Sequence, residues 1–172
     1  RDEELTEATG TATATRAEKL GGKVMKAPFD VPEVGRIAVL VDPQGAALGI
    51  YTPANPEDKR SEDVEAGHFC WSELATTDRE GALGFYGELF GWAKTESMDT
   101  PNGGVYQMFK APGLERSNGG VIDKPDMVPV SMWLYYVKVD DLDGALATTK
   151  KLGGQVVNGP MGRVDLRRGA QL

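Results

Sequence analysis

Apolar and polar residues alternate along the chain at two spacings, one helical and one extended. Between residues 79 and 90 apolar side chains recur at intervals of three and four, which predicts an amphipathic helix. Asp78 is a suitable N-cap for this helix, and Gly91 is a suitable end. Short runs rich in β-branched and aromatic residues, each bounded by turn residues, predict strands at 36–41, 46–51, 105–110 and 119–122. The two spacings together predict an α+β protein.

An internal repeat relates two distant segments of the chain. Residues 17–30 and 149–162 share six identities at an offset of 132. Each copy combines the end of a helix with a Gly-Gly pair suited to a left-handed cap. A short strand is then predicted at 23–26 and at 155–158, and each stops at a proline.

A weaker repeat at an offset of 63 relates residues 71–83 to 134–146. Both copies fit a strand, an Asp-containing junction and a helix that begins after it. The two repeats together predict βαβββ modules, one complete and two partial. The predicted division is a partial module at 9–54, a linker at 55–66, a complete module at 67–125, a partial module at 129–160 and an atypical tail at 161–172.

Composition and charge narrow the functional classes. The formal net charge of the 172 residues is −7, which would repel a nucleic-acid backbone, and the basic cluster Arg163, Arg167 and Arg168 has no interleaved aromatic residues. No apolar run reaches the ~18 residues of a membrane helix. The single cysteine, Cys70, excludes a disulfide within the chain, and the acidic first residues lack a signal-peptide core. We therefore expect a cytoplasmic protein with no nucleic-acid or membrane partner.

Residues 68–92, HFCWSELATTDREGALGFYGELFGW, resemble the opening module of the glyoxalase/bleomycin-resistance/extradiol-dioxygenase (vicinal oxygen chelate) superfamily, and residues 31–47 resemble its closing strands. The similarity is greatest to the two-domain bacterial hydroxylase-like members. It implies repeated βαβββ modules forming curled mixed sheets around a cavity, with helices outside. It also implies a homodimer, with exchange of strands between chains as one arrangement. Residues 9–51 would then supply the strands missing after Pro160, within one chain or between two.

The resemblance also carries expectations about metal ions. Many members bind a divalent metal through His, Gln or Glu at three positions, which correspond here to Trp71, Leu134 and Gly49. These residues offer no ligating side chain, so no cofactor is expected at the usual positions, and a divalent metal at other positions stays open. His68 could be a displaced ligand, but it better fits a partly exposed residue at a strand start. Cys70 better fits a small core residue than a nucleophile.

Strand alternation gathers the candidate site on one side of a sheet. Glu73 is the candidate catalytic acid or base, because a buried, unpaired carboxylate has a raised pKa. The alternative is an aromatic core in which Glu73 pairs with a lysine or arginine. The candidate ligand-binding residues are Phe69, Trp71, Tyr106, Met108, Leu134 and Tyr136.

Two functions from different classes remain open on the sequence. The favoured one is a small-molecule-binding protein that needs only an aromatic groove and lacks the usual metal triad. The other is a lyase or dioxygenase acting on a small carbonyl or aromatic substrate. A third hypothesis is a truncated product with no activity of its own.

Overall fold

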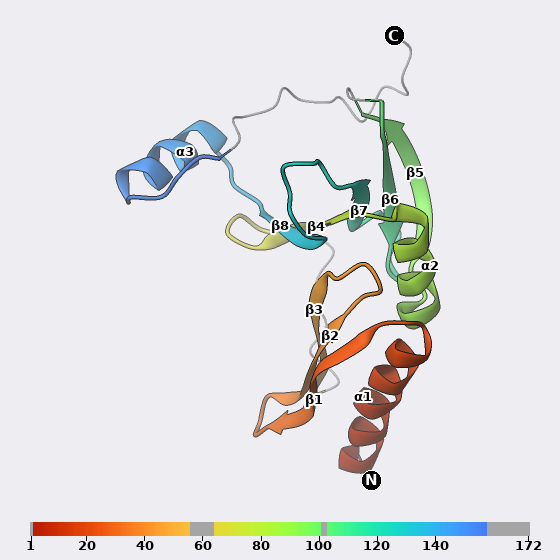
Figure 1. Cartoon of the computed structure of the whole chain (residues 1–172). Helices are drawn as coiled ribbons and strands as arrows, with labels where there is room; N and C mark the ends of the chain where they lie inside the picture. The colour runs from red at the N-terminus through yellow and green to blue at the C-terminus, as the bar shows by residue number, and fades with distance from the viewer. Residues whose placement is uncertain (1, 56–63, 101–102, 158–172) are drawn as a thin grey trace.

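Three helices and two sheets make up the part of the chain that the computed structural model describes, residues 2–55, 64–100 and 103–157 (Figure 1). The N-terminal segment contains one helix and three strands: α1 (Asp2–Lys19), β1 (Lys23–Val31), β2 (Gly35–Val41) and β3 (Ala47–Pro53). The middle segment contains β4 (Phe69–Thr76), α2 (Arg79–Phe90), β5 (Ala93–Asp99), β6 (Val105–Lys110) and β7 (Gly119–Asp123). β8 (Met132–Val137) and α3 (Leu142–Lys151) follow. The predicted α+β class is confirmed.

Hydrophobic patterns and capping residues in the sequence predicted the positions of most helices and strands. The helix predicted at 79–90 has those bounds, Asp78 caps it through a hydrogen bond from the Gly81 backbone N–H, and Gly91 ends it in the left-handed conformation. The strands predicted at 36–41, 46–51, 105–110 and 119–122 are present within two residues. The pattern did not locate β5, whose sequence is mostly polar and mostly exposed.

Two strand predictions beside prolines were wrong. β1 does not stop before Pro28 but continues to Val31, because β1 is an edge strand whose pairing with β2 shifts register there. The strand predicted at 155–158 is missing at residues 155–157, and Asn158 lies outside the described residues. The tail at 161–172 and most of the linker at 55–66 also lie outside them.

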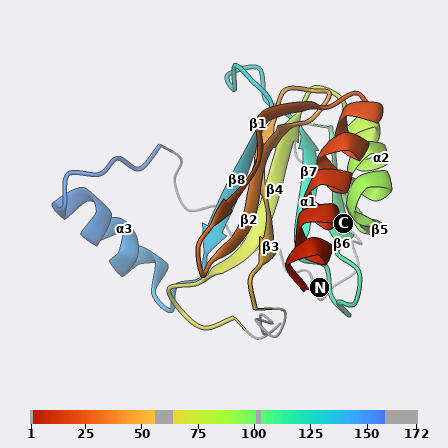
Figure 2. The same ribbon diagram turned by 90° about the horizontal axis from the view of Figure 1, so that it is seen from below.

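The larger sheet has the strand order β5-β6-β7-β4-β8. β4 runs parallel to β7 and antiparallel to β8, so it is an interior strand with a neighbour on each side. The smaller sheet is antiparallel, in the order β1-β2-β3. α1 and α2 lie side by side on the same side of the sheets (Figure 2).

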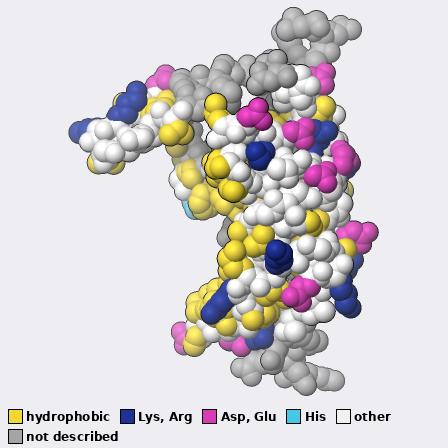
Figure 3. Space-filling view, in the orientation of Figure 1, with side chains coloured by type: hydrophobic (Ala, Val, Ile, Leu, Met, Phe, Trp, Pro, Cys, Tyr) yellow, Lys and Arg dark blue, Asp and Glu magenta, His cyan; other side chains and the backbone are white. Residues whose placement is uncertain are grey.

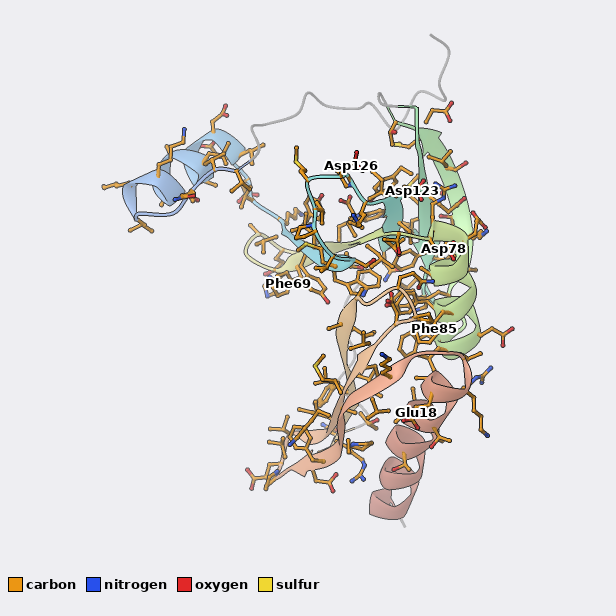
Figure 4. The ribbon with its side chains drawn as sticks, viewed as in Figure 1. Glu18, Phe69, Asp78, Phe85, Asp123 and Asp126 are labelled. Atoms are coloured by element: carbon orange, nitrogen blue, oxygen red, sulfur yellow. The ribbon has the colours of Figure 1, made fainter. Side chains whose placement is uncertain are left out.

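A shared core joins the two sheets through α2. Phe85 of α2 points toward the N-terminal segment (Figure 4), where its ring leaves no room for a side chain at Gly22. The hydroxyl of Tyr86 donates a 2.9 Å hydrogen bond to the buried carboxylate of Asp42, just after β2. The buried residues of this core come from α1, β2 and the turn after it, α2 and the larger sheet: Ala14, Ala17, Leu40, Ala46, Leu74, Ala82, Leu83, Phe85, Tyr86, Leu89, Phe109 and Val121.

The N-terminal strands were expected to supply the strands missing from the last module, and the structure shows a contact there but no strand pairing. β3 contacts β8, but within the described residues β3 forms a strand ladder only with β2, and β8 only with β4. Without a ladder between β3 and β8 the two sheets stay separate and open, rather than curling around one cavity. Exchange of strands between two chains remains a prediction.

α3 projects away from both sheets (Figure 1). Asp141, in the Asp-containing junction predicted before this helix, caps it by accepting a hydrogen bond from the Gly144 backbone N–H, but none of the helix residues is buried. In the space-filling view, apolar side chains gather along the edge that carries the smaller sheet and continue toward α3 (Figure 3). None of the helices in the described ranges is long and apolar enough to cross a bilayer.

Candidate functional site

The buried residue Leu74 shows which side chains of β4 point toward α2 and which point away from it. Leu74 is fully buried on the side covered by α2, so alternation turns Trp71 and Glu73 to the opposite side. The ladder with β8 pairs Trp71 with Tyr136 and Glu73 with Leu134. The predicted facing of these four residues therefore agrees with the observed register.

β6 adds Tyr106 and Met108 to the same face. Phe109 is buried on the α2 side, which turns its neighbour Met108 and, two residues earlier, Tyr106 away from the helix. The ring of Tyr106 then crosses β7 at Gly120, where an added Cβ would lie 2.3 Å from ring atoms. Gly120 therefore allows Tyr106 to reach β4, and the sequence analysis missed this role. A glycine inside a strand often marks such a close approach.

One hydrogen bond and the charge of Glu73 link these side chains. The indole Nε1–H of Trp71 donates to the hydroxyl of Tyr106 over 2.7 Å. The Glu73 carboxylate interacts with the hydroxyls of both Tyr106 and Tyr136. We call Trp71, Glu73, Tyr106 and Tyr136 the aromatic–carboxylate cluster.

The surroundings of both phenols raise their pKa values further above neutral pH. Burial is the largest cause that raises the pKa of Tyr106, and the Glu73 charge raises it further, although the Trp71 hydrogen bond acts in the opposite direction. Burial and the Glu73 charge raise the pKa of Tyr136 to about 12. Both hydroxyls can therefore donate to the carboxylate or to a ligand.

The cluster forms an open face rather than an enclosed cavity. Tyr136 is 38% exposed and Leu134 is 47% exposed. No lysine or arginine in the described part of the chain forms an ion pair with Glu73. The alternative of a packed core with Glu73 paired to a base is therefore not what the structure contains.

Phe69 departs from the expected alternation. The ladder between β4 and β8 shifts register between Phe69 and Trp71, so Phe69 pairs with Val137. Its ring meets the ring of Tyr135 edge to face at a centroid distance of 5.8 Å (Phe69 is labelled in Figure 4). Tyr135 lies on the face opposite Tyr136, so Phe69 belongs with Tyr135 and not with the cluster.

The same register shift explains why Cys70 is exposed. It was expected in the core, but it is exposed, because it is the extra residue at the register shift. Its sulfur lies 3.4 Å from the backbone oxygen of Tyr136. His68 is exposed just before β4, in agreement with the simpler interpretation, and its carbonyl accepts a hydrogen bond from the Lys138 backbone.

The residues at the three usual metal positions do not fit a divalent cation. Trp71 uses its indole N–H as a donor to Tyr106, and Leu134 and Gly49 have no donor atoms in their side chains. Among residues 2–55, 64–100 and 103–157, no group of three His, Cys, Asp or Glu side chains is arranged to hold a metal ion.

Comparison with known proteins gives the family. No family model matches the sequence. A “Glyoxylase-like domain-containing protein” of Didymella fabae is 33% identical over 90 residues, which cover 52% of this chain and 70% of that protein. The chain belongs to the glyoxalase/bleomycin-resistance/dioxygenase superfamily.

Longer relatives in this superfamily extend the match. “Putative glyoxylase CFP32” of Mycobacterium tuberculosis is 35% identical over 140 residues, covering 81% of this chain and 52% of the relative. “Anthracycline biosynthesis protein DauV” of a Streptomyces species is 32% identical over 162 residues, covering 92% of this chain and 55% of the relative. The chain thus spans about half the length of these curated relatives.

The fold agrees with this assignment. The crystal structure of BphC, a halotolerant catechol dioxygenase, matches 85% of this chain and 53% of its own with a TM-score of 0.51, at 12% identity. At that identity the match concerns the fold alone.

Proposed function

We propose that this chain binds a planar aromatic molecule carrying a positive charge, at the aromatic–carboxylate cluster and without a divalent metal. The observation that carries the proposal is the position of Glu73, a carboxylate with no basic partner in the described residues, beside the rings of Trp71, Tyr106 and Tyr136. Aromatic faces attract organic cations, and a nearby carboxylate adds a direct charge interaction. An aromatic wall with a few placed polar groups is also typical of small-molecule sites.

The relatives support an aromatic ligand. Two of them, from Streptomyces, are named for anthracycline biosynthesis. Anthracyclines contain fused aromatic rings, and many carry an amino sugar that is protonated at neutral pH. Such a molecule matches both the ring surface and the carboxylate of the cluster.

Paired ligands and paired variants test this function by isothermal titration calorimetry. An anthracycline amine should bind wild-type protein more tightly than its N-acetyl derivative, which keeps the rings and loses the charge. Glu73→Gln should remove that preference, because the variant no longer supplies the opposing charge. Asp143→Asn on α3 removes an exposed charge elsewhere and should leave the preference unchanged. Equal affinity of wild-type protein for the two ligands would contradict the proposal.

A second candidate function is proton transfer on a small carbonyl substrate. The observation in its favour is a carboxylate that interacts with two protonated phenols, an arrangement that could accept a proton while the phenols donate to a substrate oxygen. Deuterium exchange at the carbon next to the carbonyl of methylglyoxal, followed by NMR, tests it. Exchange that wild-type protein accelerates and Glu73→Gln does not supports this second function. Exchange with wild-type protein at the rate of buffer alone contradicts it.

A homodimer remains part of the proposal. β8 is an edge strand with exposed apolar residues, including Met132, Leu134 and Val137, and such an edge favours association. Sedimentation equilibrium of the whole chain should give twice the chain mass. A protein that stays monomeric at high concentration would contradict the homodimer and leave the ligand proposal unaffected.

A further inference from the structure

A pocket of about 390 Å³ lies at the start of β4, beyond the aromatic–carboxylate cluster. It is bounded by the first residues of β4, by β8 and by the loop between β6 and β7. Trp71 borders both sites, but the pocket lining includes Ser72 and Tyr135, a ladder pair on the opposite face from Glu73. The pocket is therefore a separate candidate site.

The polar groups of this pocket are suited to an anion. No Asp or Glu belongs to the lining, in a chain whose net charge is −7. Arg116 lines the pocket, is exposed and forms no ion pair with any described residue. A guanidinium offers a planar pair of donors that matches a carboxylate.

Asn118 adds a second donor. Its side-chain oxygen accepts a 2.9 Å hydrogen bond from the Ala111 backbone N–H, which fixes the orientation of the amide. The amide nitrogen has no partner among the described residues, and Asn118 belongs to the pocket lining. Ser117 contributes less, because its hydroxyl is already engaged by Thr95 and Glu96.

The walls of the pocket are apolar and aromatic. Phe69 and Tyr135 meet edge to face at 5.8 Å, and Leu114 belongs to the same lining. Phe69 is 64% exposed and Tyr135 is 54% exposed, so a ligand ring would cover apolar surface that is now in water. The register shift at Cys70 creates this wall, because it turns Phe69 toward Tyr135.

We propose that this pocket binds an aromatic monocarboxylate, with its ring against Phe69, Tyr135 and Leu114 and its carboxylate on Arg116 and Asn118. The ligand is opposite in charge to the one proposed for the cluster. The two sites can therefore be tested separately, and failure of one leaves the other standing.

Calorimetry with 2-naphthoate as the probe tests the binding. Wild-type protein should bind 2-naphthoate and bind the neutral 2-naphthamide more weakly. Arg116→Gln should weaken 2-naphthoate binding about tenfold or more, since a lost charge-assisted contact has that scale. Arg116→Lys should lie between the two, and Lys150→Gln on the projecting α3 should equal wild type. Equal binding of the acid and the amide, or full binding by Arg116→Gln, would overturn the proposal.

Cys70 gives an independent readout, because it is the only cysteine in the chain and it lines the pocket. 2-Naphthoate should slow the alkylation of Cys70 by iodoacetamide, a neutral reagent, and about tenfold more 2-naphthoate should be needed for the same slowing in Arg116→Gln. Glu73→Gln should retain the protection, because Glu73 is not part of the lining. Unchanged alkylation in the presence of bound 2-naphthoate would place the ligand elsewhere and refute the assignment.

Discussion

The indole nitrogen of Trp71 donates a 2.7 Å hydrogen bond to the hydroxyl of Tyr106, which reaches it from two strands away in the sheet. This contact fixes the direction of both rings on the face away from α2. It also occupies the indole N–H at the position where many relatives of this superfamily keep a metal ligand. The interaction therefore holds the two rings together as one surface, and the tryptophan itself, which has no ligating atom, is why the position does not fit a metal.

We predict that Tyr106→Phe destabilises the protein modestly and disturbs the cluster. Loss of a part-buried hydrogen bond should lower the free energy of unfolding by about 0.5–1.5 kcal/mol. Urea denaturation followed by Trp fluorescence measures the change. Trp71→Phe combined with Tyr106→Phe should cost less than the sum of the single variants, because both remove the same hydrogen bond. Additive costs would show that the bond contributes nothing.

Gly120→Ala should displace Tyr106 without unfolding the chain. The added Cβ would lie 2.3 Å from the Tyr106 ring, so the ring must move off β7. The expected result is a cost of about 1–3 kcal/mol, the scale of overpacking, with loss of anthracycline binding. Gly49→Ala is the matched control on a strand, since the nearest atom to its Cβ is 4.0 Å away. This control should change neither the stability nor the anthracycline binding. Unchanged binding in Gly120→Ala would show that the site does not need Tyr106 in its observed place.

Stability should fall at alkaline pH because of the raised tyrosine pKa values. The pKa of Tyr136 is raised from 10.0 to about 12, and that of Tyr106 is raised as well. Between these values the folded state keeps a proton that the unfolded state has lost. The stabilisation is therefore complete below pH 10 and declines as the pH rises through this window. Urea midpoints measured from pH 9 to pH 12 should decline less steeply for Tyr136→Phe, and identical slopes would contradict the assignment.

The two Asp caps should differ in their effect on global stability. Asp78 caps α2, which has five buried residues, whereas Asp141 caps α3, which has none. Asp78→Ala should cost about 0.5–2 kcal/mol, the range for loss of an N-cap. Asp141→Ala should leave the main unfolding transition unchanged and reduce only the helical signal. Thermal melts by circular dichroism compare them, and equal costs would mean that α3 packs against the body in solution.

The predictable parts of the site were those set by local periodicity. Alternation along β4 placed Trp71 and Glu73 on one face, opposite the buried side chain of Leu74, which follows Glu73. Phe69 could not be placed in the same way, since the register shift at Cys70 depends on how β8 pairs with β4. Gly120 was missed because its role depends on a ring from a neighbouring strand.

The same distinction holds for the fold. Asp78 and Gly91 act through their own helix and were predicted from the sequence, as was the Asp-containing junction that supplies Asp141 as the cap of α3. The path of β1 past Pro28 and the absence of a strand at 155–157 depend on which edges are available for pairing. Edge availability is a property of the assembled sheet and leaves no local pattern.

The most direct test of the proposed site is the indole N–H spectrum of the protein during titration with the anthracycline amine. The chain has three tryptophans, so three indole signals are expected, and Trp71→Phe identifies one of them by its loss. The proposal predicts that the Trp71 signal shifts on titration, with the signals of Trp92 and Trp133, which pack against the core on the α2 side, nearly unchanged. A Trp71 signal that stays in place while the ligand binds would contradict it.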